Sequence, residues 1–484
     1  MHARPSEPRG PRGSNPRRGA TRAQARWAGG VEGVPPGAAL RRPPRADGRR
    51  LAGAAFSAIL PGLGQFLNGR SQMGLAFALP SLLVVGALWL VVQSASPTLL
   101  AARLVQPQTL GAVLVLNALV CAWRLVAVGQ AFLEPRLRAA PGRPGLLGVF
   151  LIVAFVVIPH ALAHSYGTAA FTTFERVFAG RGPDVSGPVT PPLGDRLNVL
   201  LMGVDSGPGR SQTLTDTLIV VSLDPIGKSV TMISVPRDMV NVPLGNGDTY
   251  APKINSLLAY AERNRDNFPN GGRQAVMSAL SSLLGITIHH YAEVRLAGFV
   301  RMIDVVGGVD VTVRRDLSDP DYGGFGVGPG WSIEAGKHHL DGPNALAYAR
   351  IRRSTGESDF TRAERQQQVL VAMRDAAVKQ NLLFSLPGLL EAVGDAVRSD
   401  LPRERLPELA ALAEEIGGES TVNVVIRSPL VRGASNRYGA VQIPDIPAIR
   451  RVVAAAVPEP GEEPEPWPTP RPTRSPRPTA TPRG

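Results

Sequence analysis

Charged and polar side chains that could bind a phosphorylated ligand recur along residues 198–370 of this 484-residue chain. Each lies at the end of an apolar segment or on the apolar side of a predicted helix, where an unpaired charge is costly. The set comprises Asp205, Asp216, Arg237, Arg350, Arg352, Arg362 and Gln366. Several cations and two carboxylates that meet in one cleft would suit a phosphorylated ligand with a divalent metal ion.

Three apolar segments predict the strands that position the first three of these residues. The segments are 198–204, 217–223 and 229–235. Residues 224–228 (DPIGK) are typical of a turn between the second and third segments. If the three strands form a meander, the end of the first, the start of the second and the end of the third meet at one rim. Asp205, Asp216 and Arg237 then converge at that rim.

The other apolar patterns predict both helices and strands, which indicates an α/β fold with a mixed sheet flanked by helices. Helices are expected at 273–284, 297–306 and 361–379, and strands at 309–313 and 346–351. Arg350 and Arg352 are two residues apart, so on a strand they would share one face.

The predicted helix 361–379 carries two polar residues in line with its apolar stripe. Arg362 and Gln366 continue the row of Val369 and Met373 at helical spacing, so they should point inward. An inward arginine is unusual unless it meets an anion. Four arginines against two aspartates also leave positive charge in excess, although structural ion pairs among these residues are an alternative explanation.

Most of the positive charge of the chain lies outside this region. The formal net charge is +13, and residues 1–50 supply +9 of it, from twelve arginines and three acidic residues. These residues are rich in Pro and Gly, which predicts a disordered basic tail. Because the basic pI describes mainly a tail, no nucleic-acid partner is predicted. The single cysteine, Cys121, excludes a disulfide within the chain.

Residues 51–165 predict a membrane region with three spans, at about 74–92, 110–132 and 146–163. The segment 51–67 contains Pro61, Gly62 and Gly64, so it is predicted to be interfacial or re-entrant rather than spanning.

The distribution of arginines between the spans predicts the orientation. The basic tail and the loop 133–145, which holds three arginines, are expected on the cytoplasmic side. The loop 93–109 has one arginine and is expected outside. A multi-pass cell-membrane protein with a cytoplasmic N-terminus and an extracellular globular domain follows.

Composition divides the rest of the chain into four segments. A linker is predicted at 166–194, the main globular domain at 195–380, an extension of it at 381–457 and a Pro-rich, extended tail at 458–484.

Seven strings in this region resemble the LytR-CpsA-Psr family of membrane-anchored cell-envelope glycopolymer transferases. They are LNVLLMGVD (197–205), TDTLIVVSLDP (215–225), VTMISVPRDMVNVP (230–243), KIN (253–255), LLGITIHHYAEVRLAGFVRMIDVVGGVDVTV (283–313), GKHHLDGPNALAYARIRR (336–353) and DFTRAERQQQVL (359–370). Together they cover nearly all of 195–380 in order, so the resemblance is specific.

The resemblance implies a Mg²⁺-dependent phosphotransferase, with Mn²⁺ as a substitute, that takes a polyprenyl pyrophosphate-linked glycan as donor. The acceptor would be peptidoglycan or another envelope polymer, and the enzyme would lie at the membrane. Carried over by position, Asp205 and Asp216 would bind the metal, and with Arg237 they would be catalytic. The pyrophosphate would be bound by Arg210, Lys253, Arg350, Arg352, Arg362, Arg365 and Gln366.

This chain departs from the family pattern near the two aspartates. The family often has an arginine two residues after the first aspartate, where this chain has Gly207. Arg210, in the same loop, is the expected substitute. Leu214-Thr215 also stands where Arg-Ser is frequent.

Two other functions fit the same residues. A polyprenyl pyrophosphate pyrophosphatase would use water in place of the acceptor, and the sequence does not separate the two reactions. A non-catalytic lipid-phosphate-binding regulator would need the arginines alone, so the pair Asp205/Asp216 favours an enzyme.

Overall fold

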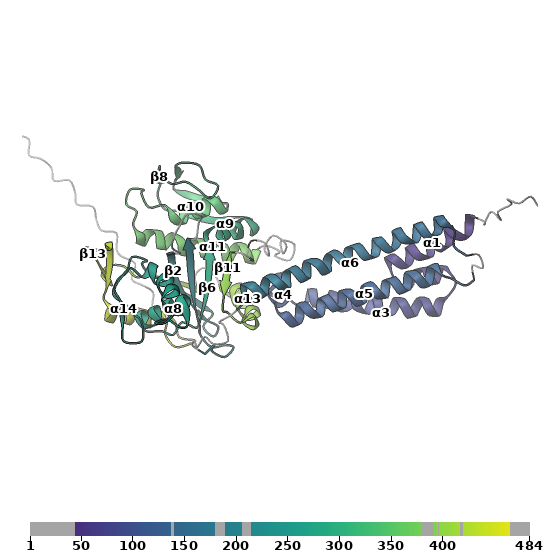
Figure 1. The fold of residues 1–484 in the computed structure, drawn as a ribbon, viewed down its shortest axis with the longest axis horizontal. Coiled ribbons are helices and arrows are strands. Elements are labelled where there is room, and N and C mark those ends of the chain that lie inside the picture. The colour runs from purple at the N-terminus through teal and green to yellow at the C-terminus, as the bar shows by residue number, and fades with distance from the viewer. Residues whose placement is uncertain are drawn as a thin grey trace, which may run out of the picture.

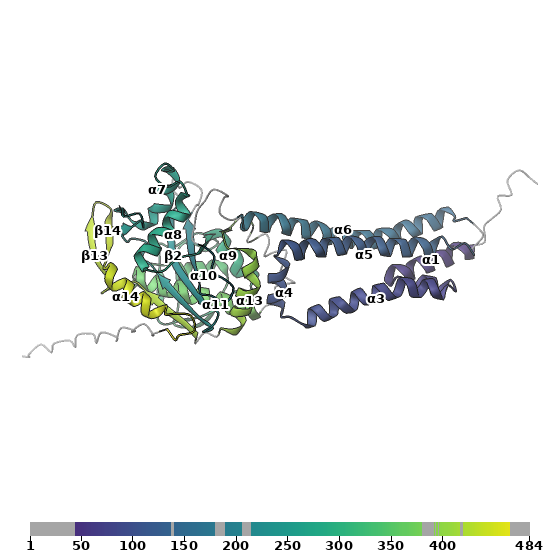
Figure 2. The ribbon, with the colours of Figure 1, turned by 90° about the horizontal axis from the view of Figure 1, so that it is seen from below.

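The N-terminal part of the chain is an elongated helical bundle, and the remainder is an α/β domain at one end of it (Figures 1 and 2). The computed structural model describes residues 44–136, 140–179, 189–205, 214–379, 392, 394, 396–416 and 420–464. The predicted disorder of residues 1–43 and of the tail from 465 lies outside the described residues.

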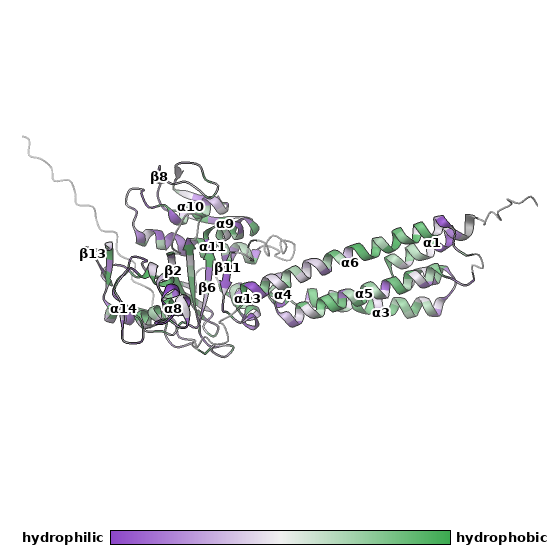
Figure 3. Cartoon of the chain, viewed as in Figure 1, coloured by the Kyte–Doolittle hydropathy of each residue, from purple (hydrophilic) through white to green (hydrophobic). Residues whose placement is uncertain are grey.

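Three long helices of the bundle correspond to the predicted spans. The bundle helices are α1 (Pro44–Ile59), α2 (Leu63–Leu67), α3 (Ser71–Gln93), α4 (Pro97–Leu104), α5 (Pro107–Phe132) and α6 (Arg143–Val177). Helices α3, α5 and α6 are long and apolar enough to cross a membrane. Figure 3 shows that apolar residues predominate along them.

The predicted start of the linker at 166 is wrong, because α6 continues to Val177. Its last turns carry Ala170, Phe174 and Val177 at helical spacing, all buried. Ala170 and Phe174 pack with Leu110 of α5, and this contact extends the helix beyond the apolar run that marks the span.

The segment 51–67 forms two helices that break at Leu60-Pro61-Gly62. Gly62 has a φ of 106°, and a Cβ there would lie 2.3 Å from the carbonyl oxygen of Gly74, so only glycine fits. The break leaves the carbonyl of Ala58 free, and Arg124 of α5 donates to it at 2.5 Å. Arg124, a charged residue within a predicted span, therefore supplies a hydrogen bond that the interrupted helix cannot make.

The basic tail ends earlier than predicted, because residues 44–50 belong to α1. Arg50 is buried and donates to the carbonyl of Phe132 at 2.7 Å. Asp47 accepts from the backbone N–H of Gly142 at 3.2 Å. These contacts anchor the first turns of α1 on α5 and on the start of α6. Composition alone does not reveal such contacts between distant segments.

The α/β domain is built on one six-stranded mixed sheet, which confirms the predicted fold class. The strands are β1 (Leu197–Asp205), β2 (Leu214–Asp224), β3 (Ser229–Ser234), β6 (His290–Arg295), β11 (Val397–Ser399) and β12 (Thr421–Val425). Their order is β11-β6-β1-β2-β3-β12. Strands β1, β2 and β3 form the predicted antiparallel meander, whereas β6 and β12 join it in parallel.

The predicted domain boundary at 380 divides this sheet. Strands β11 and β12 follow residue 380 and form its two edges. Residues 381–457 therefore complete the domain rather than extend it.

Alternate residues of the central strands pack against helices on one face of the sheet. Leu200, Met202 and Val220 belong to a core with three helices, α7 (Leu257–Arg263), α8 (Gly271–Leu284) and α14 (Ile446–Ala456). A second core joins α10 (Gly342–Arg350) and α11 (Asp359–Lys379) to β7 (Val309–Val313). The remaining elements are β4 (Val242–Pro243), β5 (Thr249–Tyr250), η1 (Ile254–Ser256), α9 (Leu296–Val305), β8 (Leu317–Asp319), β9 (Trp331–Ile333), β10 (Gly336–Leu340), η2 (Arg403–Arg405), α13 (Leu406–Glu415), β13 (Val431–Asn436) and β14 (Gly439–Pro444).

Residues 346–351, predicted as a strand, belong to α10 and its C-cap. Asp341 caps this helix by accepting from the N–H of Asn344, and Pro343 lies in the first turn. A short apolar run fits a helix or a strand equally well, and here the cap decides. Arg350 therefore ends a helix, and Arg352 lies in the loop after it.

The domain rests directly on the end of the bundle at which α4 lies. The loop 93–109 contains α4, which packs against α13. Ser96 Oγ donates to Glu414 at 2.5 Å, and Arg403 pairs with Glu175 of α6 at 2.9 Å. The bundle helices thus support the domain directly.

Candidate active site

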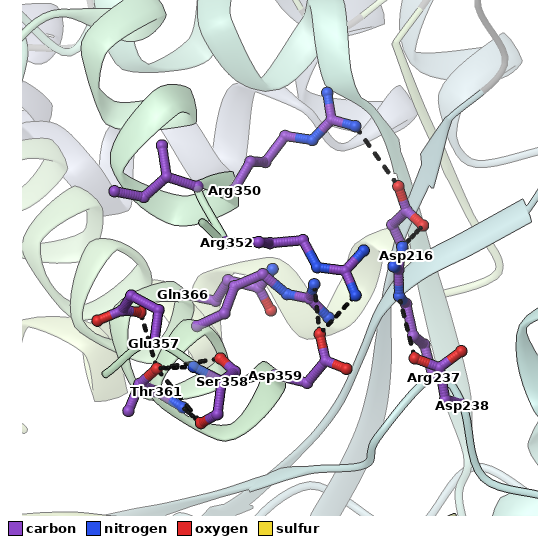
Figure 4. A network of polar contacts seen from close by, with 12 residues as sticks. Asp216, Arg237, Asp238, Arg350, Arg352, Glu357, Ser358, Asp359, Thr361 and Gln366 are labelled. Carbon is purple, nitrogen blue, oxygen red and sulfur yellow. Dashed lines mark hydrogen bonds and ion pairs between the residues drawn. The ribbon is translucent and has the colours of Figure 1, made fainter. Parts of the chain in front are cut away.

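The three ionisable residues of the strand meander meet at one rim of the sheet, as predicted. Arg237 Nη1 lies 2.5 Å from Asp216 Oδ1. Arg350 Nη2 reaches the same rim from α10, at 3.2 Å from Asp205 Oδ2 and 3.6 Å from Asp216 Oδ2. Two carboxylates therefore face a single guanidinium nitrogen. Figure 4 shows Arg350 reaching toward Asp216.

The loop after α10 and the first turns of α11 contribute a second group of ion pairs. Arg352 Nη2 lies 3.1 Å from Asp359 Oδ1, and Arg362 Nη1 lies 2.8 Å from the same oxygen. Arg362 is buried, and Gln366 lines the same hollow between α11 and the rim. The prediction that both side chains point inward is confirmed.

Asp238 and Asp359 belong to this site, although sequence reasoning missed them. Asp238 Oδ1 accepts from Lys253 Nζ at 2.7 Å, and Asp238 Oδ2 lies 3.7 Å from Arg237 Nε. Two signals could have found them: Asp238 directly follows Arg237, and Asp359 precedes Arg362 by three residues at the start of a helix.

These side chains form one group, here called the arginine–aspartate cluster. It consists of Asp205, Asp216, Arg237, Asp238, Lys253, Arg350, Arg352, Asp359 and Arg362. Among the described residues it holds five cations and four carboxylates, an excess of one positive charge. The sequence predicts an excess of two, so the ion pairs are more complete than expected.

The electrostatics of Arg362 show that the cluster is nevertheless unfavourable for a further cation. Burial, together with repulsion from Arg237 and Arg352, lowers the pKa of Arg362 from its usual value to about 10, although Asp359 opposes the shift. Burial raises the pKa of Asp359, but the pull of Arg362, Arg352 and Arg237 is stronger and the net shift is downward. A buried site that disfavours its own arginine charge favours an anion.

A buried donor in the cluster supports the same conclusion. Arg237 Nε is buried and makes no hydrogen bond with any residue that the structure describes. The carboxylate oxygen Oδ2 of Asp238 lies 3.7 Å from it. A phosphate oxygen would supply the missing acceptor.

Arg365, predicted to bind pyrophosphate, lies outside the cluster. Its Nε and Nη2 donate to the carbonyls of Tyr348 and Ile351, each at 2.7 Å, and Nη1 pairs with buried Glu357. Arg365 lies three residues after Arg362 on α11, so the two side chains leave the helix in different directions. The Arg365 side chain points toward α10. Arg210, the predicted substitute for a family arginine, lies outside the described residues.

Arg365→Ala should destabilise the fold and leave ligand binding intact. It removes two hydrogen bonds to buried carbonyls and one partner of Glu357, although Arg315 still contacts that carboxylate. We expect the free energy of unfolding to fall by about 3 kcal/mol. Equilibrium denaturation of the full chain in detergent measures the loss. An unchanged denaturation midpoint would show that this ion-pair group is not structural.

The two carboxylates of the rim fit a magnesium ion. Asp205 and Asp216 direct oxygens at one point, and Mg²⁺ typically binds one or two carboxylates together with substrate phosphates. Within the described ranges, no group of three or more His, Cys, Asp or Glu side chains could hold a metal ion. Two carboxylates alone would leave the other coordination positions of such an ion to substrate oxygens or water.

Comparison with known proteins identifies the family. The sequence model of the LytR_cpsA_psr family matches residues 183–446, which are 264 of the 484 residues. This chain belongs to the LytR_cpsA_psr family. The arginine–aspartate cluster lies wholly within the matched residues, whereas the bundle helices precede them.

Curated relatives within the family are named as teichoic acid transferases. The polyisoprenyl-teichoic acid–peptidoglycan teichoic acid transferase TagU of Halalkalibacterium halodurans is 33% identical over 220 residues, 44% of this chain and 64% of TagU. TagV of Bacillus subtilis, with the same description, is 29% identical over 300 residues, 60% of this chain and 72% of TagV. The chain thus spans 64% of the length of that TagU.

Among solved structures, the crystal structure of TagV from B. subtilis has a TM-score of 0.44 with this chain. Sequence identity in that comparison is 25%, over 55% of this chain and 98% of the TagV chain.

Proposed function

We propose that this chain is a membrane-anchored phosphotransferase that moves a glycopolymer from a polyprenyl pyrophosphate carrier onto peptidoglycan or another cell-envelope acceptor. The names of its relatives support a transferase that acts on a polyisoprenyl-linked polymer. The observation that carries the proposal is the convergence of Arg350 on both Asp205 and Asp216, beside half-buried Arg237 and buried Arg362.

The ion pairs of the cluster would exchange partners when the donor binds. The hollow between α11 and the rim is only about 20 Å³, roughly the space of one water molecule. A pyrophosphate therefore enters only if the arginines leave the aspartates and turn to phosphate oxygens. Arginine suits this exchange, because its planar group binds carboxylate and phosphate with similar geometry.

The aspartates released by this exchange would take two roles. Asp205 and Asp216 would hold Mg²⁺, or Mn²⁺, whose chemistry is to offset the charge on the pyrophosphate oxygens. Asp216 is the third residue of β2 and lines the small hollow. The carboxylate oxygen that does not bind the metal ion would accept a proton there.

In the proposed reaction, a sugar hydroxyl of the acceptor attacks the phosphorus next to the glycan and gives its proton to Asp216. A new P–O bond forms to the acceptor, and the P–O bond to polyprenyl phosphate breaks. Arg237, Arg350, Arg352 and Arg362 would stabilise the negative charge that develops on the leaving phosphate.

The proposed location follows from the apolar helices and the arginines between them. Helices α3, α5 and α6 would cross the membrane, with the basic tail and the loop 133–145 on the cytoplasmic side. The α/β domain would then lie outside the cell, where the acceptor is found. Its direct contacts with α4 and α6 would hold the cluster close to the membrane that contains the donor.

The proposal is tested with the full chain in detergent, a polyprenyl pyrophosphate-linked oligosaccharide, Mg²⁺ and a peptidoglycan fragment. Mass spectrometry should detect the oligosaccharide phosphate joined to the fragment, together with free polyprenyl phosphate. Release of polyprenyl phosphate without joining, over a panel of acceptors, would instead identify a pyrophosphatase. Tight donor binding with neither product would identify a lipid-phosphate-binding protein.

A further inference from the structure

A second and much larger hollow lies on the far face of α11 from Arg362 and Gln366. It is an open groove of about 900 Å³. Its α11 wall comprises Thr361, Glu364, Arg365, Gln367, Gln368, Val371, Ala372 and Asp375, a set centred on the row of Glu364, Gln368 and Asp375. At 100° per residue, this row lies about half a turn from the row of Arg362 and Gln366. The groove is therefore separate from the cluster along most of the helix.

The opposite wall of the groove is the edge strand β12 together with Arg427, two residues beyond its end. Thr421, Val422, Asn423, Val425 and Arg427 line it. Strand β12 is the last strand of the sheet on this side, and the edge at the other end is β11, which contacts α6. With strands roughly 4.8 Å apart, the two edges are about 24 Å apart. The groove thus flanks the edge opposite to the one held by the membrane helix.

The lining of the groove combines hydrogen-bonding groups with a small apolar floor. Carboxylates and guanidinium groups alternate: Glu364 lies 2.8 Å from Arg427 and 4.0 Å from Arg314. The Arg314 side chain is 90% exposed, so that pair is loose. Asn423 is exposed on the strand wall, and Val371 and Val422 supply apolar surface between the polar groups.

This chemistry matches a glycan better than a prenyl chain. Sugar hydroxyls both donate and accept hydrogen bonds, and amide, carboxylate and guanidinium groups together offer both functions. The C–H faces of sugar rings can lie on small apolar side chains. A prenyl chain would leave the charged groups of an otherwise open groove without solvent or partners.

The groove and the cluster meet at the N-terminal end of α11. Val425 lines both hollows. Within one turn of chain, Glu357 and Thr361 line the groove, whereas Asp359 and Arg362 line the cluster hollow. Figure 4 shows Glu357 and Thr361 beside Asp359. A polymer lying in the groove can therefore present one end to the Asp216 side of the cluster.

We propose that this groove binds the glycan chain of the acceptor and directs one of its hydroxyls to the arginine–aspartate cluster. This proposal rests on the proposed transferase function and assigns its second substrate to a site. Donor and acceptor would approach from opposite faces of α11, the donor along the Arg362 row and the acceptor along the Glu364 row.

The test uses tryptophan substitutions that narrow the groove without touching the cluster. Asn423→Trp fills it from the strand wall, and Asp375→Trp fills it from the helix wall. Ser435→Trp, on exposed β13 outside the groove, is the matched control. The probe is a peptidoglycan glycan chain freed of stem peptides, and its binding to the full chain is measured without donor.

We expect both groove variants to raise the Kd for the glycan chain, and the KM for the acceptor, by at least about tenfold. Equilibrium binding of the donor lipid should stay unchanged in both groove variants, and Ser435→Trp should behave as wild type. Wild-type glycan binding and transfer in both groove variants would overturn the proposal. Binding of stem peptide alone, with no glycan binding, would overturn it too.

The outcome for the groove is distinguishable from the outcome for the transferase function. If wild type forms no joined product but binds glycan in a way that Asn423→Trp abolishes, the groove assignment stands and the transferase function fails. If wild type transfers normally and both groove variants do so with unchanged KM, the groove assignment alone fails.

Discussion

Asp216→Asn should lower the rate of glycopolymer transfer by about a thousandfold, since a positioned general base contributes roughly 10²–10⁴-fold. The amide keeps the shape of the side chain but accepts no proton from the attacking hydroxyl and binds a metal ion poorly. Donor binding should remain measurable, because Arg350, Arg352 and Arg362 are unaltered. Single-turnover transfer and equilibrium binding of the donor lipid separate the two effects.

Asp359→Asn is the matched control for this substitution. It makes the same isosteric change to a carboxylate that contacts Arg352 and Arg362 on the other side of the cluster. We expect its transfer rate to fall by no more than about tenfold, in line with the weakening of charged hydrogen bonds. A fully active Asp216→Asn variant would refute the role of Asp216 as base.

Arg362→Gln should weaken donor binding by about 10–100-fold, since a hydrogen bond to a charged group contributes roughly 1.5–3 kcal/mol. The fold should not lose stability to the same extent. Burial and the neighbouring Arg237 and Arg352 lower the pKa of Arg362 to about 10, so the folded state disfavours its charge. Removing the charge relieves that repulsion, and Asp359 keeps Arg352 as a partner.

Arg362 and Arg365 offer an internal comparison, because they lie three residues apart on one helix. Arg362→Gln should lose donor affinity with little loss of stability, whereas Arg365→Ala should lose stability with unchanged donor affinity per folded molecule. Donor titration and denaturation of both variants measure the two quantities side by side. Equal losses of affinity would place Arg365 in the binding site after all, and an unaffected Arg362→Gln would remove Arg362 from it.

The direction of the proton linkage for Arg362 follows from the lowered pKa. Because its folded-state pKa, about 10, lies below that of the free group, the folded state releases this proton first as pH rises. Its charge therefore opposes folding at neutral pH, and this penalty disappears as pH rises through that range. A bound anion would offset the same penalty at neutral pH, which links donor binding to stability.

Local sequence patterns determined which side chains face the site. The short apolar runs of β1, β2 and β3, with a turn that contains Pro225 and Gly227 between the last two, are sufficient to bring Asp205, Asp216 and Arg237 to one rim. The helical spacing of Arg362 and Gln366 with apolar residues is sufficient to turn both inward. Period and turn chemistry are properties of neighbouring residues, so they can be read from the chain.

Only the tertiary structure decided which groups meet across the site. Arg350 contacts Asp205 from 145 residues away, and it does so from a helix end where a strand is predicted. The Arg365 side chain points toward α10 because the carbonyls of Tyr348 and Ile351 accept its hydrogen bonds. Arg362 is buried because α11 packs over the rim of the sheet. Local periodicity specifies the face of an element but not its partner, because the partner is set by packing between distant segments.

The edges of the sheet illustrate the same limit. Strands β11 and β12 are short, and β12 begins and ends far along the chain from the strand β3 that it joins. A run of five residues carries too little pattern to predict parallel pairing with so distant a strand. The groove lies between α11 and β12, and it exists only because β12 pairs with β3. No sequence pattern of the chain could therefore have indicated it.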